Sequence, residues 1–113
     1  MASLALVAIA EIDIDEFADR VAEGVRIIDV REPDEYQAGH VPGAELIPLG
    51  TLPDHLHRLV GDGPTYLVCK SGGRSMRGCE LASSQGYEVV NVTGGTGAWI
   101  DSGRETIMGD SPS

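Results

Sequence analysis

Residues 65–75 read TYLVCKSGGRS, an apolar run that ends at Cys69 and passes through a glycine-containing turn into a helical pattern. A strand of this kind places the Cys69 sulfur at the carboxyl edge of a sheet, where glycines allow successive backbone N–H groups to turn inward around it. A helix that begins near Arg74 adds the positive end of its dipole. The segment therefore predicts a thiolate with a pKa lowered from about 8.5 into roughly the 3.5–7.5 range.

Basic residues gather in the same segment of an acidic chain. The sequence has 8 Lys and Arg against 18 Asp and Glu, a net charge of −10, yet Lys70, Arg74 and Arg77 lie close together and no acidic residue falls between Cys69 and Cys79. A free cysteine is usually a small buried hydrophobe. Two glycines, a hydroxyl residue and two cations directly after Cys69 have no obvious packing purpose, so they favour a reactive nucleophile.

Cys79 has a different pattern. Met76 precedes it by three positions and Ala82 follows by three, which indicates a helical stripe that faces the core. We expect Cys79 to be structural, with a resolving thiol for Cys69 as the alternative.

The whole chain fits one domain over residues 1–113, with a core over about 5–105 and a flexible tail over 108–113. Its two cysteines fit a reducing compartment better than a secreted scaffold, and the apolar residues 2–10 lack a basic start and the roughly 20 residues that span a bilayer. These features predict a cytoplasmic protein. The negative charge argues against nucleic acid or an anionic membrane as partner.

Strand and helix patterns alternate along the chain. Strands are predicted over 7–12, 26–30, 45–48, 65–69 and 89–92. Helices are predicted from a capping box at Asp13 to near Gly24, over 33–38, over 52–60, over 75–85, and in a short segment after Gly95. In the 52–60 helix, one face carries Leu52, Leu56, Leu59 and Val60. This order predicts an α/β fold, a parallel five-stranded sheet with helices on both faces, with ligands at the carboxyl ends of the strands.

Three segments carry a family resemblance. Residues 29–36 read DVREPDEY and 39–44 read GHVPGA, residues 69–75 read CKSGGRS, and residues 94–99 read GGTGAW. In this order they resemble the opening signature, the active loop and the closing G-G-x-x-x-W of the rhodanese family, and the likeness covers about residues 5–105. The resemblance implies a single rhodanese-like domain and a sulfurtransferase of the thiosulfate type.

The resemblance also implies a mechanism, in which Cys69 takes a sulfane sulfur from a donor such as thiosulfate and passes it, as a persulfide, to a thiophilic acceptor. Lys70 is the candidate for attracting an anionic donor. Arg74 either binds substrate or, as we favour, pairs with Asp29 or Glu35 and fixes the loop. His40 is expected to be structural rather than a general base. The active-site loop that would hold the sulfur comprises Lys70, Ser71, Gly72, Gly73, Arg74 and Ser75.

Other chemistries fit less well. Four residues separate Cys69 from Arg74, whereas cysteine phosphatases use a C-x5-R loop, and this loop has no acidic residue to protonate a leaving group. No Cys or His spacing matches a zinc site, and neither nucleotide fingerprint is present. The sequence therefore predicts no metal and no cofactor.

The sequence leaves the partners of the reaction open. We expect a small-molecule sulfur donor and a thiol, cyanide or protein acceptor, although the loop departs from the C-G-S-G-V-T pattern typical of mercaptopyruvate enzymes. An alternative from another class is a persulfide carrier or partner-docking module without turnover of small donors. The intact Cys69 loop favours chemistry over docking alone.

Overall fold

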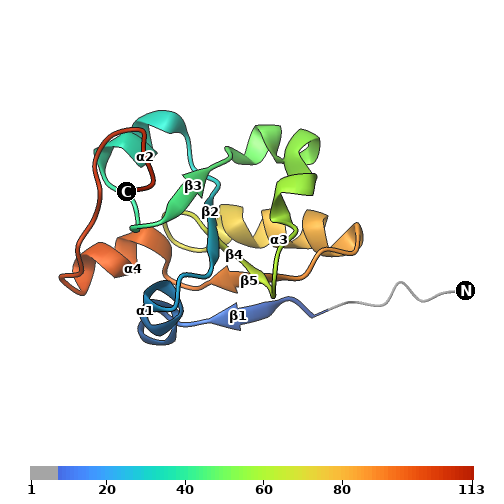
Figure 1. Ribbon diagram of the computed structural model, residues 1–113, viewed down its shortest axis with the longest axis horizontal. Helices are drawn as coiled ribbons and strands as arrows, with labels where there is room; N and C mark the ends of the chain where they lie inside the picture. Colours follow the sequence, from blue (N-terminus) through green and yellow to red (C-terminus); the bar gives the residue numbers. More distant parts are fainter. Residues whose placement is uncertain (1–7) are drawn as a thin grey trace, which may run out of the picture.

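Five parallel strands form one sheet in the order β1-β5-β4-β2-β3 (Figure 1). The computed structural model describes residues 8–113. The strands are β1 Ala10–Ile12, β2 Arg26–Asp29, β3 Ala44–Leu46, β4 Thr65–Val68 and β5 Val89–Val92. Because β4 is central, its carboxyl end lies in the middle of the sheet edge where parallel folds bind ligands.

The helices alternate with these strands, as predicted. They are α1 Ile14–Ala22, α2 Pro33–Ala38, the 3₁₀ segment η1 Leu49–Leu59, α3 Gly73–Ser84 and α4 Gly95–Asp101. The predicted cap of α1 is present, since the Asp13 side chain accepts a hydrogen bond from the N–H of Glu16 at 2.8 Å. Pro33 opens α2, where its missing N–H costs nothing.

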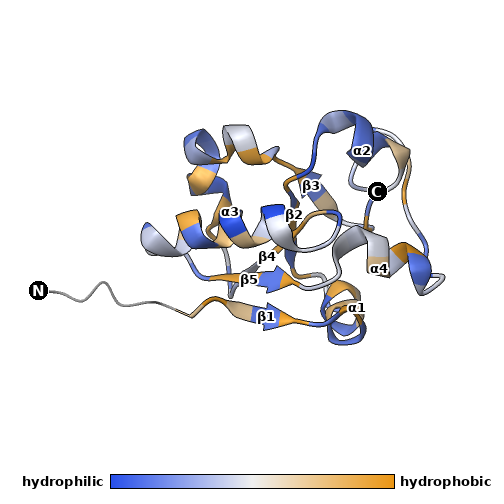
Figure 2. Cartoon of the chain, turned by 180° about the vertical axis from the view of Figure 1, so that it is seen from behind, coloured by the Kyte–Doolittle hydropathy of each residue, from blue (hydrophilic) through white to orange (hydrophobic). Residues whose placement is uncertain are grey.

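Two hydrophobic cores cover the two faces of the sheet. On one face, Ile28 and Leu67 pack with Leu52 of η1 and Ala82 of α3. On the other face, residues of the same strands pack with α1 and α4, and the aromatic rings of Phe17 and Trp99 meet edge to face at 5.8 Å. Figure 2 shows hydrophobic stretches in the strands of the sheet, and helices that carry both hydrophobic and hydrophilic residues. Burial on both faces explains why the strand sequences are so apolar.

The largest difference from the predicted elements lies in η1. The predicted α-helix over 52–60 is a 3₁₀ segment, interrupted at His55, whose backbone is not helical. Pro53 lies inside this segment and removes a backbone donor, which favours short 3₁₀ turns over a regular α-helix. Leu52 and Leu59 are buried as one face of this segment, but Val60 has an extended backbone and is 64% exposed, so its predicted place on the same face was wrong.

At one end of the chain the first strand begins later than predicted, and at the other end the tail contacts the domain. The first strand begins at Ala10, and Val7, where we expected it to start, lies outside the described residues. The tail makes hydrogen bonds to the domain, from Gly109 N to Gln37 O and from Gly43 N to Pro112 O, each at 2.9 Å. In the structure the tail therefore lies against the domain, and the flexibility expected for residues 108–113 stays a prediction.

Candidate active site

Cys69 directly follows β4, as the sequence predicts, and its sulfur lies inside a short loop that leads to α3. Gly72, the N-cap of α3, has a φ of 111°, a left-handed conformation that favours glycine. This conformation directs the N–H of Gly72 to the Cys69 Sγ at 3.1 Å. Ser75, in the first turn of α3, places its Oγ 3.3 Å from the same sulfur. The loop thus surrounds the sulfur with donors.

These donors lower the pKa of the Cys69 thiol. Burial raises the pKa of Cys69, which is only 1% exposed, but hydrogen bonds from the side chain and N–H of Ser75 and from the N–H groups of Gly72 and Ser71 outweigh it. The net pKa of Cys69 lies below its ordinary value. Because donors stabilise the anion, they favour the thiolate form that a nucleophile requires.

Cys79 lies on α3 in the opposite electrostatic setting. Its side chain is fully buried in the core, and burial, followed by the charges of Glu11 and Glu80, raises its pKa to about 12. A thiol in this state is neutral at physiological pH and attacks poorly. The geometry agrees with a structural Cys79 and gives no support to a resolving thiol.

Arg74 and Asp29 belong to two separate ion pairs. Arg74 forms a bidentate pair with Glu35 of α2, with N–O distances of 2.7 and 2.9 Å. Asp29 is fully buried and pairs instead with Arg31, whose side chain also donates to Gly39 O at 2.9 Å. Of the two partners predicted for Arg74, the structure therefore selects Glu35. The Arg74–Glu35 pair joins the start of α3 to α2 across the loop.

The amino end of α4 supports the loop from the other side. The N–H of Thr96 donates to Cys69 O at 2.8 Å, and the N–H of Gly97 donates to Lys70 O at 2.9 Å. Gly95 has a φ of 56°, and a Cβ at this position would lie 2.5 Å from Cys69 O. The glycines of the GGTGAW segment thus permit a close approach of backbone to the loop. Trp99 of the same segment lies in the core.

Asn91 of β5 contacts this site and was not predicted from the sequence. Its Oδ1 lies 2.5 Å from Ser75 Oγ, and its Nδ2 donates to Glu11 of β1 at 2.9 Å. The one available signal was a single polar residue within the apolar strand VVNV. A buried amide in such a strand requires hydrogen-bond partners, but the sequence does not say which ones.

Two other residues singled out from the sequence, His40 and Lys70, make no hydrogen bond to the sulfur in the part of the chain that the structure describes. His40 is fully buried, and its Nδ1 and Nε2 lie 2.8 Å from the carbonyl oxygens of Tyr36 and Ser111, which agrees with a structural histidine. Lys70 is exposed next to Cys69 and makes no ion pair within residues 8–113. Of the residues singled out in the loop, it is the cation left free to meet an anionic ligand.

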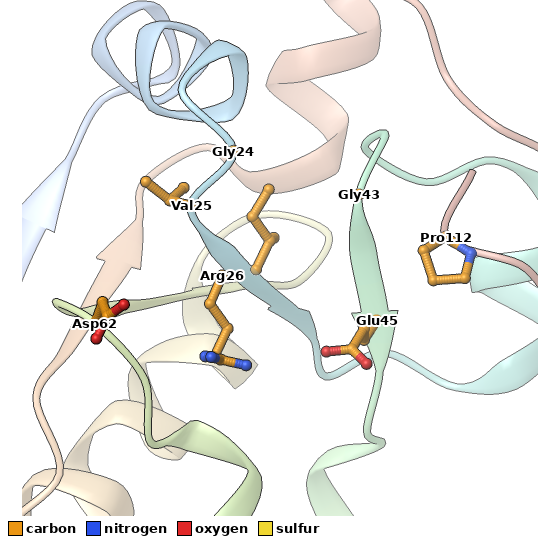
Figure 3. Close-up of a pocket in the computed structure, with 8 residues that line it drawn as sticks. Gly24, Val25, Arg26, Gly43, Glu45, Asp62 and Pro112 are labelled. Atoms are coloured by element: carbon orange, nitrogen blue, oxygen red, sulfur yellow. The ribbon is translucent and has the colours of Figure 1, made fainter.

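A pocket of about 510 Å³ lies elsewhere, at the amino-terminal ends of β2 and β3 (Figure 3). Arg26, Glu45, Asp62 and Pro112 line it. Cys69 follows the carboxyl end of β4, so this pocket is not part of the site described above. Within residues 8–113 no cluster of three metal-ligating side chains occurs, and no helix there has the length and apolarity to cross a membrane.

The fold and the cysteine loop identify the class of protein. The family model for the rhodanese-like domain matches residues 13–102, and the chain belongs to this family. A sulfurtransferase of Allochromatium vinosum is 34% identical over 100 residues, which cover 86% of this chain and 94% of the relative. The Bacillus subtilis protein YtwF, named as a candidate sulfurtransferase, is 40% identical over 77 residues, covering 68% of this chain and 75% of the relative.

Solved structures agree with this assignment. The crystal structure of a rhodanese-like domain protein from Staphylococcus aureus superimposes with a TM-score of 0.79 at 36% identity, covering 88% of this chain and 98% of that one. The family and the names of these relatives support a sulfur-transfer role for the chain.

Proposed function

We propose that the protein is a thiosulfate-type sulfurtransferase in which Cys69 carries the sulfur as a persulfide. The observation that carries this proposal is the set of donors around the Cys69 sulfur, the N–H of Gly72 at 3.1 Å and the Ser75 hydroxyl at 3.3 Å. Such donors favour an ionised thiol and, after reaction, an anionic terminal sulfur.

Two displacement steps make up the reaction. First, the Cys69 thiolate attacks the outer sulfur of thiosulfate, so that an S–S bond forms to Sγ while sulfite leaves with the electron pair of the broken bond. Second, a thiolate or cyanide attacks the outer sulfur of the persulfide, which releases the Cys69 thiolate. Each step moves one electron pair at sulfur and needs no cofactor.

The burial of Cys69 favours sulfur over phosphorus as the atom attacked. With the residue only 1% exposed, an incoming group must be narrow enough to enter the loop. The terminal sulfur of thiosulfate or of a persulfide meets this requirement. A tetrahedral phosphoryl group needs donors around three equatorial oxygens, and the four-residue spacing to Arg74 leaves little backbone to supply them.

The charged residues of the loop have separate roles in this proposal. Lys70, exposed next to Cys69, attracts the anionic donor. Arg74 holds the loop through Glu35 and is engaged on both of its terminal nitrogens, so it acts as a positioning residue. Asp29, at the end of β2, binds Arg31, which also donates to Gly39 O, so this pair has a supporting role outside the loop.

The experiment that tests this function is mass spectrometry of the intact protein after exposure to thiosulfate, followed by peptide mapping. We expect one added sulfur on Cys69, its removal by cyanide with formation of thiocyanate, and no sulfur uptake by Cys69→Ser. Cys79→Ser is the matched control and should keep most of the activity. Added sulfur on Cys79 alone would contradict the proposal.

Two further outcomes have defined meanings. A persulfide that forms but does not pass its sulfur to cyanide or to a small thiol would indicate a carrier without small-molecule turnover. Hydrolysis of an aryl phosphate by the wild-type protein, above the level of Cys69→Ser, would contradict the loop-length argument and require another enzyme class.

A further inference from the structure

Three buried side chains form a polar cluster beneath the active loop. Cys69 and Asn91 are each 1% exposed and Ser75 is fully buried. Ser75 Oγ lies between the other two, 3.3 Å from Cys69 Sγ and 2.5 Å from Asn91 Oδ1. The cluster continues to Glu11, which lies opposite Asn91 in the β1–β5 register.

The orientation of the Asn91 amide follows from its partners. Its Nδ2 faces the Glu11 carboxylate at 2.9 Å and the carbonyl oxygen of Gly72 at 3.3 Å. An ionised carboxylate and a carbonyl only accept hydrogen bonds, so the donating NH₂ must point toward them. The Oδ1 of Asn91 must then point toward Ser75. Asn91 is therefore an acceptor for the Ser75 hydroxyl.

The Ser75 hydroxyl has only one hydrogen to donate. Three acceptors lie within reach of its Oγ, namely Asn91 Oδ1 at 2.5 Å, Cys69 Sγ at 3.3 Å and Gly72 O at 3.3 Å. The nearest is the amide oxygen. A hydrogen bond to the thiolate is thus made at the expense of one to Asn91, and the two acceptors compete.

We propose that Asn91, oriented by Glu11, is a positioning residue that competes with the Cys69 sulfur for the Ser75 hydrogen and so limits the stabilisation of the thiolate. The competition changes with the state of Cys69. After sulfur uptake, Sγ is bonded to a second sulfur and the negative charge lies on the outer sulfur, so Ser75 can return its hydrogen to Asn91. Where the proposed function holds, on which this part rests, Asn91 favours the loaded form over the free thiolate.

Other charged and titratable groups near Cys69 do not share this hydrogen. Arg74 is paired with Glu35, the Cys79 thiol is neutral in the core, and the exposed Lys70 makes no ion pair within residues 8–113. Asn91 Oδ1 and the sulfur both accept from the Ser75 hydroxyl, so an effect of Asn91 on Cys69 through this competition should depend on Ser75. Gly72 is a second link, since its carbonyl accepts from Asn91 Nδ2 at 3.3 Å and its N–H donates to the sulfur at 3.1 Å, and an effect through Gly72 should not depend on Ser75.

A double-mutant cycle on the alkylation of Cys69 by iodoacetamide tests the proposal, with the rate followed against pH in a Cys79→Ser background. The reaction needs no sulfur donor. Asn91→Leu, close in volume but without an acceptor, should shift the midpoint of the profile to lower pH by about half a unit, the effect of one ordinary hydrogen bond. Ser75→Ala should shift it to higher pH, and adding Asn91→Leu to Ser75→Ala should change nothing further.

A supporting role of Asn91 in loop structure alone predicts the opposite result. A midpoint raised by Asn91→Leu, or shifted equally with and without Ser75, would overturn the proposal. If Asn91→Leu does not fold, Glu11→Gln takes its place, since loss of the carboxylate frees the Asn91 amide to turn. Glu80→Gln is the control, because it removes an equal charge near Cys79. Equal shifts from these two variants would also overturn it. Absence of sulfur uptake from thiosulfate in the wild-type protein would contradict the proposed function but would leave the alkylation result intact.

Discussion

At the scale of single residues, the two cysteines show how surroundings determine the chemistry of a thiol. Both are buried and both lie in the same hydrophobic cluster. Cys69 has N–H and hydroxyl donors around its sulfur, and its pKa is lowered, whereas burial raises the pKa of Cys79 to about 12. The difference comes from hydrogen bonds to the anion rather than from exposure.

Lys70 should affect the binding of an anionic donor more than the chemical step. We expect Lys70→Ala to raise KM for thiosulfate more than it lowers kcat, because an exposed charge attracts the ground state and the transition state alike. Added salt should reduce the effect, since screening acts within about 8–10 Å at 0.1–0.15 M. Steady-state kinetics at two salt concentrations measure this. Arg77→Ala, which removes an exposed cation of α3, is the control, and equal effects of the two variants would contradict a specific role of Lys70.

The Glu35–Arg74 pair should make stability depend on pH. Hydrogen bonds from Arg74 lower the pKa of Glu35 from its ordinary 4.5 to about 2. A depressed carboxylate pKa contributes stability that is complete above about pH 4.5 and is lost as the pH falls toward 2. Glu35→Gln should therefore cost about 1 kcal/mol at pH 7, a modest value because both side chains are partly exposed, and progressively less toward pH 2.

Urea unfolding at several pH values measures this difference. Glu23→Gln, which removes the exposed partner of Arg20 on α1, is the matched control and should cost less than about 0.5 kcal/mol at any pH. A Glu35→Gln penalty that stays constant between pH 7 and pH 2 would show that the ion pair is not its source.

At the scale of elements, the active loop is held by α2, α3 and α4 together. Arg74 of α3 pairs with Glu35 of α2, while the first N–H groups of α4 donate to the carbonyl oxygens of Cys69 and Lys70. The loop therefore depends on α2 and α4, which lie outside it in the sequence, as well as on α3, which follows it directly. A change in α4 should displace Cys69 through its carbonyl oxygen, without contact to the sulfur.

A glycine substitution in α4 tests this dependence. In Gly95→Ala the new Cβ would lie 2.5 Å from Cys69 O, so the loop must move, and we expect a loss of more than about 2 kcal/mol of stability and most of the sulfur transfer. Gly103→Ala is the control, because its φ of 81° is equally left-handed but no atom lies within 4 Å of the new Cβ. It should cost about 1 kcal/mol of backbone strain and leave activity unchanged. Thermal unfolding and thiocyanate formation measure both effects, and similar activities of the two variants would count against the role of α4.

The same elements show what the sequence can and cannot predict. Alternating strand and helix patterns predicted the sheet, and the strand-to-glycine transition at residues 65–75 predicted the loop, because both signals are local. The contact of Arg74 with Glu35, 39 positions apart, was predicted only as one of two alternatives, and the contact of Asn91 with Ser75, 16 positions apart, was not predicted. Such contacts depend on the order and register of strands, which periodicity leaves open. The leucine spacing predicted an α-helix over 52–60, but Pro53 inside this segment favours 3₁₀ turns.

At the scale of the whole molecule, the candidate active site and the pocket lie at opposite ends of the sheet. Cys69 lies at the carboxyl ends of the strands, where the loop, α2 and α4 meet. The opposite end has the pocket beside Arg26 and Glu45, and Pro112 of the chain's tail forms part of its wall. Removing the tail should therefore lower the free energy of unfolding without changing the rate of sulfur transfer.

Truncation after Met108 tests this separation. It removes the hydrogen bonds that Gly109, Ser111 and Pro112 make to the domain, and it leaves one ring nitrogen of the buried His40 without its carbonyl partner. Three lost hydrogen bonds at about 1 kcal/mol each, partly replaced by water, should lower the free energy of unfolding by about 2 kcal/mol. Because the tail bonds to Gln37, His40 and Gly43 rather than to Glu35 or to residues 69–75, kcat and KM for sulfur transfer should stay at wild-type values at temperatures below the lowered Tm. Urea unfolding and thiocyanate formation on the same samples measure the two quantities, and a truncated protein with unchanged stability but impaired transfer would show that the tail serves the active site instead.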